Sequence, residues 1–340
     1  MRASQQDYLL LGGAPLYSGM INRWRIRLPP ERKGDHMGQN SDAQKLAEEL
    51  ESVVGKGNIV TDEPMSEHTT FKIGGPADLF VLPGNADEVK KTLEVLKTAG
   101  MPYFILGKGS DLLVDDAGYR GAIVSLERFC EIHVEGTKLR CGAGATLKDV
   151  CAAAEAAGLS GLEFACGIPG SVGGAAFMNA GAYDGVTADV LESLAALDAD
   201  GNMRTYQNAE LDFGYRRSRV RTEGLIVLEV TYALKRGDKA EIQAKMDDLT
   251  RRREEKQPLE YGSAGSTFKR PEGFFAGKLI TDAGLKGYRV GDAAVSTKHA
   301  GFVVNLGHAT AKDVHAVIGH VQDEVLKQFG VFLEPEVRFL

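Results

Sequence analysis

The chain has few of the residues that build disulfide scaffolds, zinc sites or membrane spans. Its four cysteines form no CxxC pair and are accompanied by no paired histidines, which excludes the common zinc patterns and is typical of a reducing compartment. No apolar run approaches the roughly 20 residues of a transmembrane helix. We therefore expect a cytoplasmic protein with free thiols, no metal site and no membrane partner.

The chain also has no excess of positive charge, because its formal net charge is −7 at neutral pH. This balance argues against a general nucleic-acid binder. Internal repeats, low-complexity tracts and the GxGxxG strand–turn–helix of a Rossmann fold are missing too. With 340 residues the chain is nevertheless long enough for two or three domains with ample core.

The first 36 residues differ in composition from the rest. They hold six basic and three acidic residues, and their apolar run at 8–11 is too short for a signal peptide. A transit peptide is one alternative. Codons for Lys33-Gly34-Asp35 can spell AAAGGAGA, a ribosome-binding sequence, just before Met37. We therefore expect residues 1–36 to be a non-native or disordered leader, with the native start at Met37.

Hydrophobic periodicity predicts an α+β protein with many short strands and scattered helices. Helices are expected at 42–54 (capped by Ser41), 86–99, 146–157, 239–256, 274–283 and 312–329. A strand, a Gly-Gly-Pro turn and a second strand are expected within 69–83, and an apolar strand at 331–340. Further strands are expected at 103–106, 122–125, 131–134, 138–141, 191–198, 203–206, 225–234 and 301–305.

Two glycine-rich stretches are the most informative part of the sequence. Residues 164–183 read FACGIPGSVGGAAFMNAGAY, and residues 106–114 read LGKGSDLLV. Glycine lets a backbone approach a ligand closely because it has no Cβ, and successive free N–H groups in such turns form anion-binding nests. Together the stretches predict a cradle for a dinucleotide or flavin. Two tight turns in an α/β protein are the alternative interpretation.

Six motifs, in this order along the chain, resemble those of the UDP-N-acetylenolpyruvoylglucosamine reductase (MurB) family. They are HTTFKIGGPADL (68–79), LGKGSDLLV (106–114), GIPGSVGGAAFMNAGAY (167–183), FGYRRSRV (213–220), GSAGSTFKRP (262–271) and LEPEVRF (333–339). The resemblance covers essentially all of 58–340. It implies a two-subdomain FAD-binding fold of the vanillyl-alcohol-oxidase (PCMH) type plus a smaller α/β substrate-binding domain. The short connection before GSAGSTFKRP resembles the compact second type of the family, which lacks an extra substrate-capping loop.

The resemblance also implies a domain plan. An N-terminal helix over 37–57 is followed by the FAD-binding domain over 58–235 and the substrate-binding domain over 236–330. The segment 331–340 then returns to the active site as a strand.

The implied activity is NADPH-dependent, FAD-mediated reduction of UDP-N-acetylglucosamine enolpyruvate to UDP-N-acetylmuramate in peptidoglycan precursor synthesis. FAD would be held without a covalent bond, the partners would be small molecules, and a monomer is expected. The main alternative keeps the fold but oxidises an alcohol, hydroxy acid or sugar. A flavin-free binding or regulatory protein is the third interpretation.

Three catalytic residues are implied by the resemblance. Arg216 would bind the substrate carboxylate, with which a guanidinium forms two hydrogen bonds. Ser266 would donate a proton, and Glu336 would lie beside the enolate. Because a carboxylate is unfavourable there, we expect Glu336 to have a raised pKa or to be protonated. The structural alternatives are a solvated basic strand for Arg216, a turn serine for Ser266, and an exposed strand end for Glu336, with Glu334 on the same face.

Cofactor and substrate contacts are implied in the same way. The FAD set is Gly74, Gly75, Gly107, Lys108, Gly109, Ser110, Asp111, Gly167, Ile168, Pro169, Gly170, Ser171, Gly173, Gly174, Ala175, Asn179, Gly181 and Ala182. The substrate set is Tyr215, Arg253, Arg270, Lys286, His299 and Arg338. Asp111 and Arg270 replace asparagines expected from the family. A diphosphate repels an acid, so we expect the Asp111 side chain to point away or to accept backbone hydrogen bonds. His68 and His133 are expected to be structural histidines.

Overall fold

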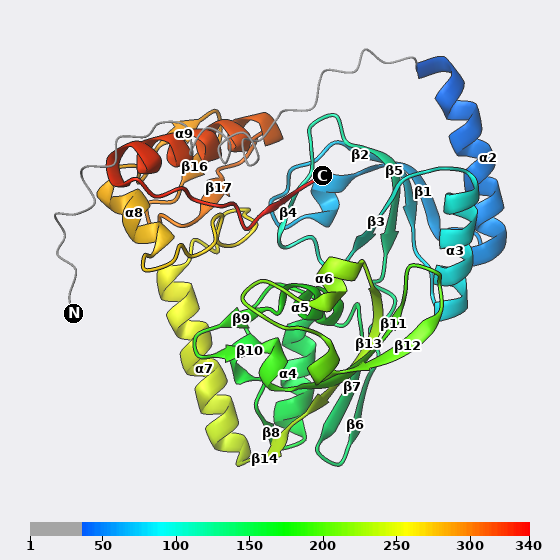
Figure 1. Cartoon of the computed structure of the whole chain (residues 1–340), viewed down its shortest axis with the longest axis horizontal. Helices are drawn as coiled ribbons and strands as arrows, with labels where there is room; N and C mark the ends of the chain where they lie inside the picture. Colours follow the sequence, from blue (N-terminus) through cyan, green and yellow to red (C-terminus); the bar gives the residue numbers. More distant parts are fainter. Residues whose placement is uncertain (1–35) are drawn as a thin grey trace, which may run out of the picture.

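The protein's structure is a computed structural model that describes residues 36–340 (Figure 1). The predicted leader therefore lies outside the described residues, apart from His36. Helix α2 (His36–Val54) begins earlier than predicted. The predicted cap, Ser41, is wrong because this residue lies inside the helix. Near its C-terminal end α2 buries Leu50 and Val54.

A first sheet has four strands in the order β1-β2-β5-β3. Strand β1 (Ile59–Pro64) runs antiparallel to β2 (Pro76–Val81), whereas β2, β5 (Tyr119–Ser125) and β3 (Tyr103–Leu106) are parallel. Helices α2 and α3 (Ala86–Thr98) lie beside this sheet in Figure 1 and pack on its buried apolar residues. Strand β3 ends at Leu106, so it leads directly into the first glycine loop, 107–111.

A second sheet is entirely antiparallel, in the order β12-β11-β13-β7-β6. Its strands are β12 (Met203–Gln207), β11 (Leu191–Leu197), β13 (Ile226–Ala233), β7 (Lys138–Gly142) and β6 (Ile132–Glu135). Helices α4 (Leu147–Ala156) and α5 (Val172–Met178) contribute to the same apolar core. Helix α5 begins after Ser171, whose hydroxyl accepts a hydrogen bond from the Gly174 N–H. The second glycine loop is therefore fixed at the start of a helix.

A third unit lies at the far end of the long helix α7 (Lys239–Lys256) in Figure 1. It consists of strands β15 (Arg289–Val290), β16 (Ala293–Val295) and β17 (Val303–Asn305) with helices α8 (Ala276–Asp282) and α9 (Ala311–Phe329). The C-terminal segment then crosses back, and β18 (Arg338–Phe339) pairs in parallel with β4 (Leu112–Leu113). The last residues of the segment are thus bound beside the first glycine loop.

Short elements make the remaining connections. They are η1 (Met65–His68), β8 (Leu159–Ser160), η2 (Glu163–Ala165), β9 (Gly181–Ala182), β10 (Gly185–Val186), η3 (Thr187–Asp189), η4 (Asn208–Glu210), α6 (Arg219–Glu223) and β14 (Lys235–Arg236). Among them, α6 matters most for the site, because it follows directly after Arg216 and Arg217.

Several predicted elements need correction. Residues 69–75 form no strand, because Lys72 and Gly74 have φ of 56° and 144° and the Thr69 hydroxyl bonds to the Ile73 carbonyl. In 331–340 only Arg338–Phe339 is a strand. Strands β1 and β16 and helices α5 and α6 were not predicted from the sequence. The predicted helix 146–157 is confirmed as α4 with Thr146 as its cap, and the helix 239–256 is confirmed as α7.

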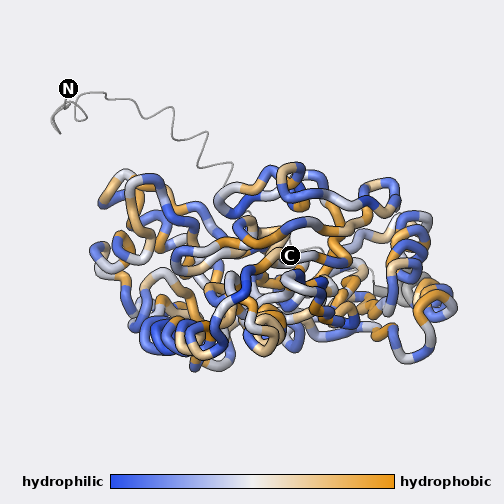
Figure 2. Tube along the Cα trace, turned by 90° about the horizontal axis from the view of Figure 1, so that it is seen from below, coloured by the Kyte–Doolittle hydropathy of each residue, from blue (hydrophilic) through white to orange (hydrophobic). Residues whose placement is uncertain are grey.

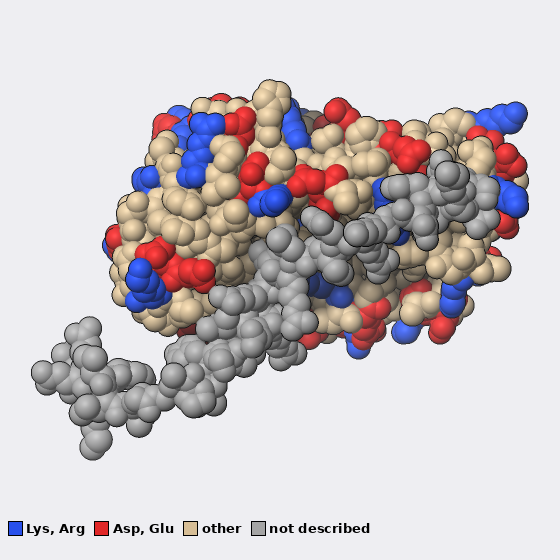
Figure 3. All heavy atoms as spheres, turned by 90° about the horizontal axis from the view of Figure 1, so that it is seen from above, with Lys and Arg blue, Asp and Glu red and all other residues tan. Residues whose placement is uncertain are grey.

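The surface and interior agree with the composition. Hydrophobic segments concentrate in the middle of the molecule in Figure 2, and acidic and basic side chains are interspersed on the face shown in Figure 3. Within residues 36–340, no helix combines the length and the apolar character that crossing a bilayer requires. In the same range, no cluster of His, Cys, Asp or Glu is arranged to hold a metal ion.

Candidate active site

Two neighbouring cavities contain most of the predicted site residues. The larger, of about 830 Å³, lies between the two glycine loops and the C-terminal segment. The smaller, of about 570 Å³, is lined by α8, by the loop that precedes it and by the loop between β16 and β17. Each has a size typical of small-molecule sites.

Most of the predicted cofactor residues line the larger cavity. Its wall includes Gly107, Lys108, Gly109, Ser110, Asp111, Ile168, Pro169, Gly170, Ser171, Gly173, Gly174, Ala175, Gly181 and Ala182. Apolar side chains complete the wall, among them Phe104, Phe177 and Ile226. The two loops, which are more than fifty residues apart in the chain, therefore face one cavity.

Four predicted cofactor residues are absent from this wall. A Cβ on Gly74 would lie 2.8 Å from Val114, and one on Gly75 only 2.3 Å from the Asp116 carbonyl, so both glycines permit close packing of the chain. Gly167 packs against the Arg253 side chain. Asn179, with φ of 45°, ends α5 and bonds through its side chain to the Gly214 carbonyl and the Ala188 N–H. These residues shape neighbouring segments instead of lining the cavity.

The second glycine loop is also not the open run of amides that the sequence suggests. The N–H groups of Ile168, Val172 and Gly173 donate to backbone carbonyls, and that of Gly174 donates to the Ser171 hydroxyl. The predicted continuous nest of free donors is therefore wrong for this part of the loop. Small side chains, which leave the wall close to the backbone, account for its shape instead.

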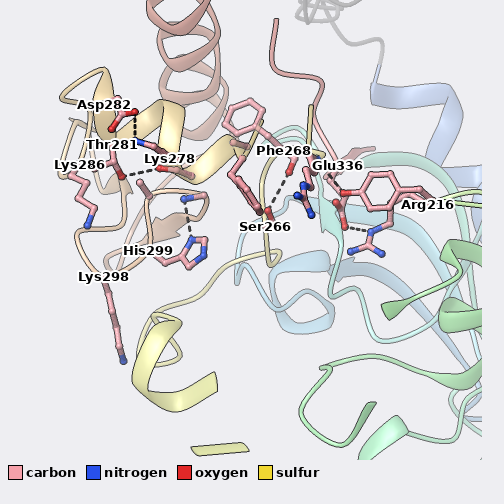
Figure 4. A pocket seen from close by; sticks show the side chains of 17 residues that line it. Arg216, Ser266, Phe268, Lys278, Thr281, Asp282, Lys286, Lys298, His299 and Glu336 are labelled. Carbon is pink, nitrogen blue, oxygen red and sulfur yellow. Dashed lines mark hydrogen bonds and ion pairs between the residues drawn. The ribbon is translucent and has the colours of Figure 1, made fainter. Parts of the chain in front are cut away.

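The smaller cavity holds four of the six predicted substrate residues: Tyr215, Arg270, Lys286 and His299. Arg253 and Arg338 line the larger cavity instead. Figure 4 shows two further cations on the wall, Lys278 and Lys298, which the sequence analysis missed. Lys278 lies on α8 and pairs with Asp282 at 2.6 Å, so in sequence it looks like an ordinary helix-surface residue.

Four residues line both cavities: Arg216, Ser266, His299 and Glu336. In Figure 4 Ser266 lies between His299 and the Arg216–Glu336 pair. The structure thus brings all three predicted catalytic residues to the junction of the two cavities, although they lie in three distant segments.

Arg216 is held firmly at this junction. Its Nε lies 2.5 Å from Glu336 Oε1, and both side chains are largely buried. Its backbone has a φ of 52°, which is strained for a non-glycine residue and is often found at functional sites. Arg221 Nη1 donates to the Arg216 carbonyl, while Asn179 bonds to the preceding Gly214. The predicted alternative of a solvated basic strand is therefore wrong for Arg216.

The choice between Glu334 and Glu336 is resolved by the same contacts. Glu334 is more exposed, pairs with Lys269 and lines neither cavity, whereas the Glu336 side chain is 12 % exposed. Burial raises the pKa of Glu336, against the opposing effect of the Arg216 guanidinium. This direction of the pKa shift agrees with the one expected from the sequence.

Ser266 sits in a tight turn next to Gly265, whose φ is +73°. The Ser266 hydroxyl donates to the Phe268 carbonyl over 3.2 Å, a long hydrogen bond within its own loop. The turn-serine interpretation is thus correct locally, and the side chain also lies on the walls of both cavities. A long local bond leaves the hydroxyl able to turn toward a ligand.

His299 contributes a neutral ring to the junction. The Gly301 N–H donates to its Nδ1, so that nitrogen carries no proton and Nε2 is the donor. Burial, together with the positive charge of Lys286, lowers the pKa of His299. Its ring also packs edge-on against Phe302. This histidine therefore supplies a hydrogen-bond donor without adding charge at neutral pH.

Aromatic and guanidinium groups alternate along the rim of the smaller cavity. The Tyr215 hydroxyl accepts a hydrogen bond from the Arg270 N–H, and the Arg216 guanidinium lies over the Tyr215 ring. The Arg270 guanidinium lies 3.9 Å from the centre of the exposed Phe275 ring. Such stacking holds planar cations in place at a cavity mouth.

Comparison with known proteins places this geometry in context. A model of a FAD binding domain matches residues 77–207, and a model of the UDP-N-acetylenolpyruvoylglucosamine reductase C-terminal domain matches residues 257–340. A reductase of that name from Clostridium beijerinckii is 55 % identical over 283 residues, which are 83 % of this chain and 93 % of the relative. The chain belongs to the UDP-N-acetylenolpyruvoylglucosamine reductase family.

Other members of the family agree. The reductase from Clostridium perfringens is 52 % identical over 304 residues, covering 89 % of this chain and 99 % of the relative. The crystal structure of the Thermus caldophilus family member has a TM-score of 0.72 at 39 % identity, covering 83 % of this chain and 97 % of that one. The predicted family, the α+β fold with its FAD-binding domain, and the cofactor FAD are confirmed.

The larger cavity suits the FAD of this reductase family. A Cβ on Gly170 would have no other atom within 3.5 Å, since the nearest is Ser110 Oγ at 3.6 Å, so a side chain there would fill cavity space. Within the described residues, two buried polar atoms on the wall lack a protein partner: Asp111 Oδ2 and Arg253 Nε. An unpaired acceptor and an unpaired donor are expected where a polar ligand completes the hydrogen bonding.

Proposed function

We propose that this chain reduces UDP-N-acetylglucosamine enolpyruvate to UDP-N-acetylmuramate, with NADPH as the reductant. The observation that carries the proposal is the junction: Arg216, Ser266 and Glu336 line both the cavity suited to FAD and the smaller, cation-rich cavity. A reaction between a bound cofactor and a second ligand requires residues that reach both. Bound FAD would supply the hydride, from flavin N5 to the vinyl carbon of the substrate.

Arg216 and Glu336 would stabilise the charge that this addition creates. The α-carbon and its carboxylate become electron-rich, and the Arg216 guanidinium can hold the carboxylate through two hydrogen bonds. The pair with Glu336 fixes the Arg216 side chain before any ligand binds. Because burial raises the Glu336 pKa, this carboxyl takes up a proton more readily than an exposed glutamate.

Ser266 would complete the reaction by protonating the α-carbon from Oγ. The addition of a hydride and a proton across the double bond then balances, and the serine oxygen must regain a proton before the next turnover. A hydroxyl is a weak acid, so this step needs a very basic carbon held in contact. The weak local hydrogen bond of Ser266 is compatible with such a transfer.

We assign the nucleotide to the smaller cavity. Lys278, Lys286, Lys298 and Arg270 place four cationic groups around it, which suits a diphosphate. The FAD would be held by the wall residues of loops 107–111 and 168–175, with Arg253 and Arg338 nearby. In this proposal residues 58–235 are the FAD-binding domain, 236–330 the substrate-binding domain and 331–340 the segment that joins them.

The proposed role is a step of peptidoglycan precursor synthesis in the cytoplasm. We propose that the protein works as a monomer on small molecules, with neither nucleic acid nor membrane as a partner. The net charge of −7 and the mixed charges on the face shown in Figure 3 support this.

The decisive experiment follows NADPH consumption under anaerobic conditions at substoichiometric enzyme, with and without the enolpyruvyl substrate. Consumption that requires this substrate and yields UDP-N-acetylmuramate is expected. One reduction of the flavin without turnover would contradict the proposal. Turnover of a simple alcohol with rapid reoxidation by oxygen would favour the oxidase, and colourless protein that cannot be reconstituted with FAD would favour the binding or regulatory role.

A further inference from the structure

Asp111 is a buried acid that the proposed reaction does not use. It ends the first glycine loop, lines the larger cavity, and its Oδ2 is buried without a hydrogen-bond partner among the described residues. The backbone donors expected for it are absent at this oxygen. Only its main-chain carbonyl is occupied, by the Arg338 N–H at 3.0 Å. An unpaired buried carboxylate oxygen is strongly unfavourable in its charged form.

Charged groups from three other segments act on Asp111, and Arg216, Glu336 and Arg338 share its cavity wall. Glu336 and Arg338 come from the C-terminal segment, Arg216 from the loop before α6, and Arg221 from α6 itself. Arg216 is already paired with Glu336. The Arg338 guanidinium lies over the rings of Phe104 and Phe177, facing the cavity wall. The cluster thus has one carboxylate that is paired and a second, Asp111, that is not.

We propose that Asp111 is a positioning residue of the FAD cavity that carries a proton. Because its carboxyl is neutral, it does not compete for the nearby guanidinium groups, which remain available to Glu336 and to an anionic cofactor. Burial, and next the negative charge of Glu336, raise the pKa of Asp111 to about 8, although Arg338, Arg216 and Arg221 oppose the shift. At neutral pH the carboxyl is therefore mostly protonated. Its O–H can then donate a hydrogen bond into the cavity.

Loss of this proton has a defined consequence. An ionised Asp111 lowers the net charge of the cluster by one unit, beside Glu336 and facing a cofactor that carries a diphosphate. Repulsion by one unit of charge in a partly buried site changes affinity on the order of tenfold. FAD affinity should therefore fall as pH rises through about 8. This inference rests on the proposed function only for the cofactor, since it makes no use of the substrate.

The test measures FAD affinity of the apoprotein by flavin fluorescence between about pH 6 and pH 9. Wild type should lose on the order of tenfold in affinity, while Asp111→Asn, which keeps the shape and a donor, should show no such loss. Asp323→Asn, an exposed residue on α9, should behave like wild type. Glu336 is present in every variant, so the difference isolates Asp111. An unchanged pH dependence in Asp111→Asn would overturn the proposal.

A second measurement needs no cofactor. If the folded protein keeps the Asp111 proton up to about pH 8 while the unfolded chain loses it near pH 4, wild-type stability falls across that range. The stability of Asp111→Asn relative to wild type should therefore rise from pH 5 to pH 8 and then level off. A difference that does not depend on pH would refute the inference. Failure of the enzyme to reduce the enolpyruvyl substrate would refute the proposed function and leave this result intact.

Discussion

At the scale of single residues, Ser266 is the proposed proton donor at the junction between the two cavities. We expect Ser266→Ala to leave flavin reduction by NADPH unchanged and to slow the oxidation of reduced enzyme by substrate by about 10²- to 10⁴-fold, the usual contribution of a positioned acid. Stopped-flow measurement of each half-reaction separates the two. Ser263→Ala, in the same segment but outside both cavities, is the control. Equal losses in both half-reactions would indicate a packing role.

Arg216 offers a second test at this scale. Lysine keeps the charge of Arg216 but loses the two-pronged geometry. We expect Arg216→Lys to lower kcat/KM for the enolpyruvyl substrate about 100-fold, which is the typical loss for one oxyanion-stabilising donor. The neighbouring Arg217→Lys changes an exposed residue paired with Asp212 and should have little effect. Similar kinetics in both variants would remove Arg216 from the proposed mechanism.

The sequence could name these residues but could not place them. The resemblance in motif assigned Ser266, Arg216 and Glu336, and their convergence depends on contacts between segments far apart in the chain. Glu334 and Glu336 were indistinguishable because a regular strand puts them on one face, and the real segment is irregular before Arg338. Lys278 and Lys298 were missed because nothing in the sequence distinguishes a cavity-lining lysine on a short helix or turn from an ordinary surface lysine.

At the scale of elements, the glycine loops form the cavity wall because their residues have small side chains or none. We expect Gly170→Val to fold, because the nearest atom to a Cβ there is 3.6 Å away. The valine methyl groups would occupy cavity space, so FAD affinity should fall by at least about tenfold, the effect of losing roughly 1.4 kcal/mol. Equilibrium dialysis with FAD and thermal melting of the apoprotein measure the two effects. Full FAD occupancy in this variant would contradict the cradle assignment.

The central strand β13 contains a polar group without a partner. Tyr232 is fully buried, and its hydroxyl makes no hydrogen bond with the described residues. Removing an unsatisfied buried hydroxyl from a well-packed ring relieves a desolvation penalty. We expect Tyr232→Phe to raise the free energy of unfolding by about 1 kcal/mol. Denaturant titration of wild type and variant measures it, and a clear loss of stability would show that the hydroxyl has a partner after all.

Elements with clear capping residues and hydrophobic periodicity could be predicted from the sequence, and elements without them could not. Thr146 and Asp238 cap their helices with side-chain hydrogen bonds, so α4 and α7 could be located from sequence. Helix α5 was missed because two glycines in its seven residues lower its intrinsic helix propensity. It forms because its first N–H groups bond to Ser171 and to the loop before α4. Tertiary contacts outweighed local preference there.

At the scale of the whole molecule, the C-terminal segment binds the third unit to the FAD cavity. It supplies Glu336 and Arg338, and its backbone bonds to Asp111, Leu113 and Asp115. A variant ending at Val337 loses the β18–β4 pairing and the Arg338 guanidinium. We expect it to lose FAD affinity by one to two orders of magnitude, because it lacks a partly buried cation and several hydrogen bonds. Unchanged FAD affinity would show that the segment is dispensable.

The same segment has a consequence for how the protein is made. The first glycine loop leaves the ribosome early, whereas the residues that close its cavity follow only after most of the chain has been synthesised. A nascent chain therefore carries an incomplete pocket throughout nearly all of translation. FAD can therefore bind with full affinity only after the residues around Glu336 and Arg338, which line its cavity, have been synthesised.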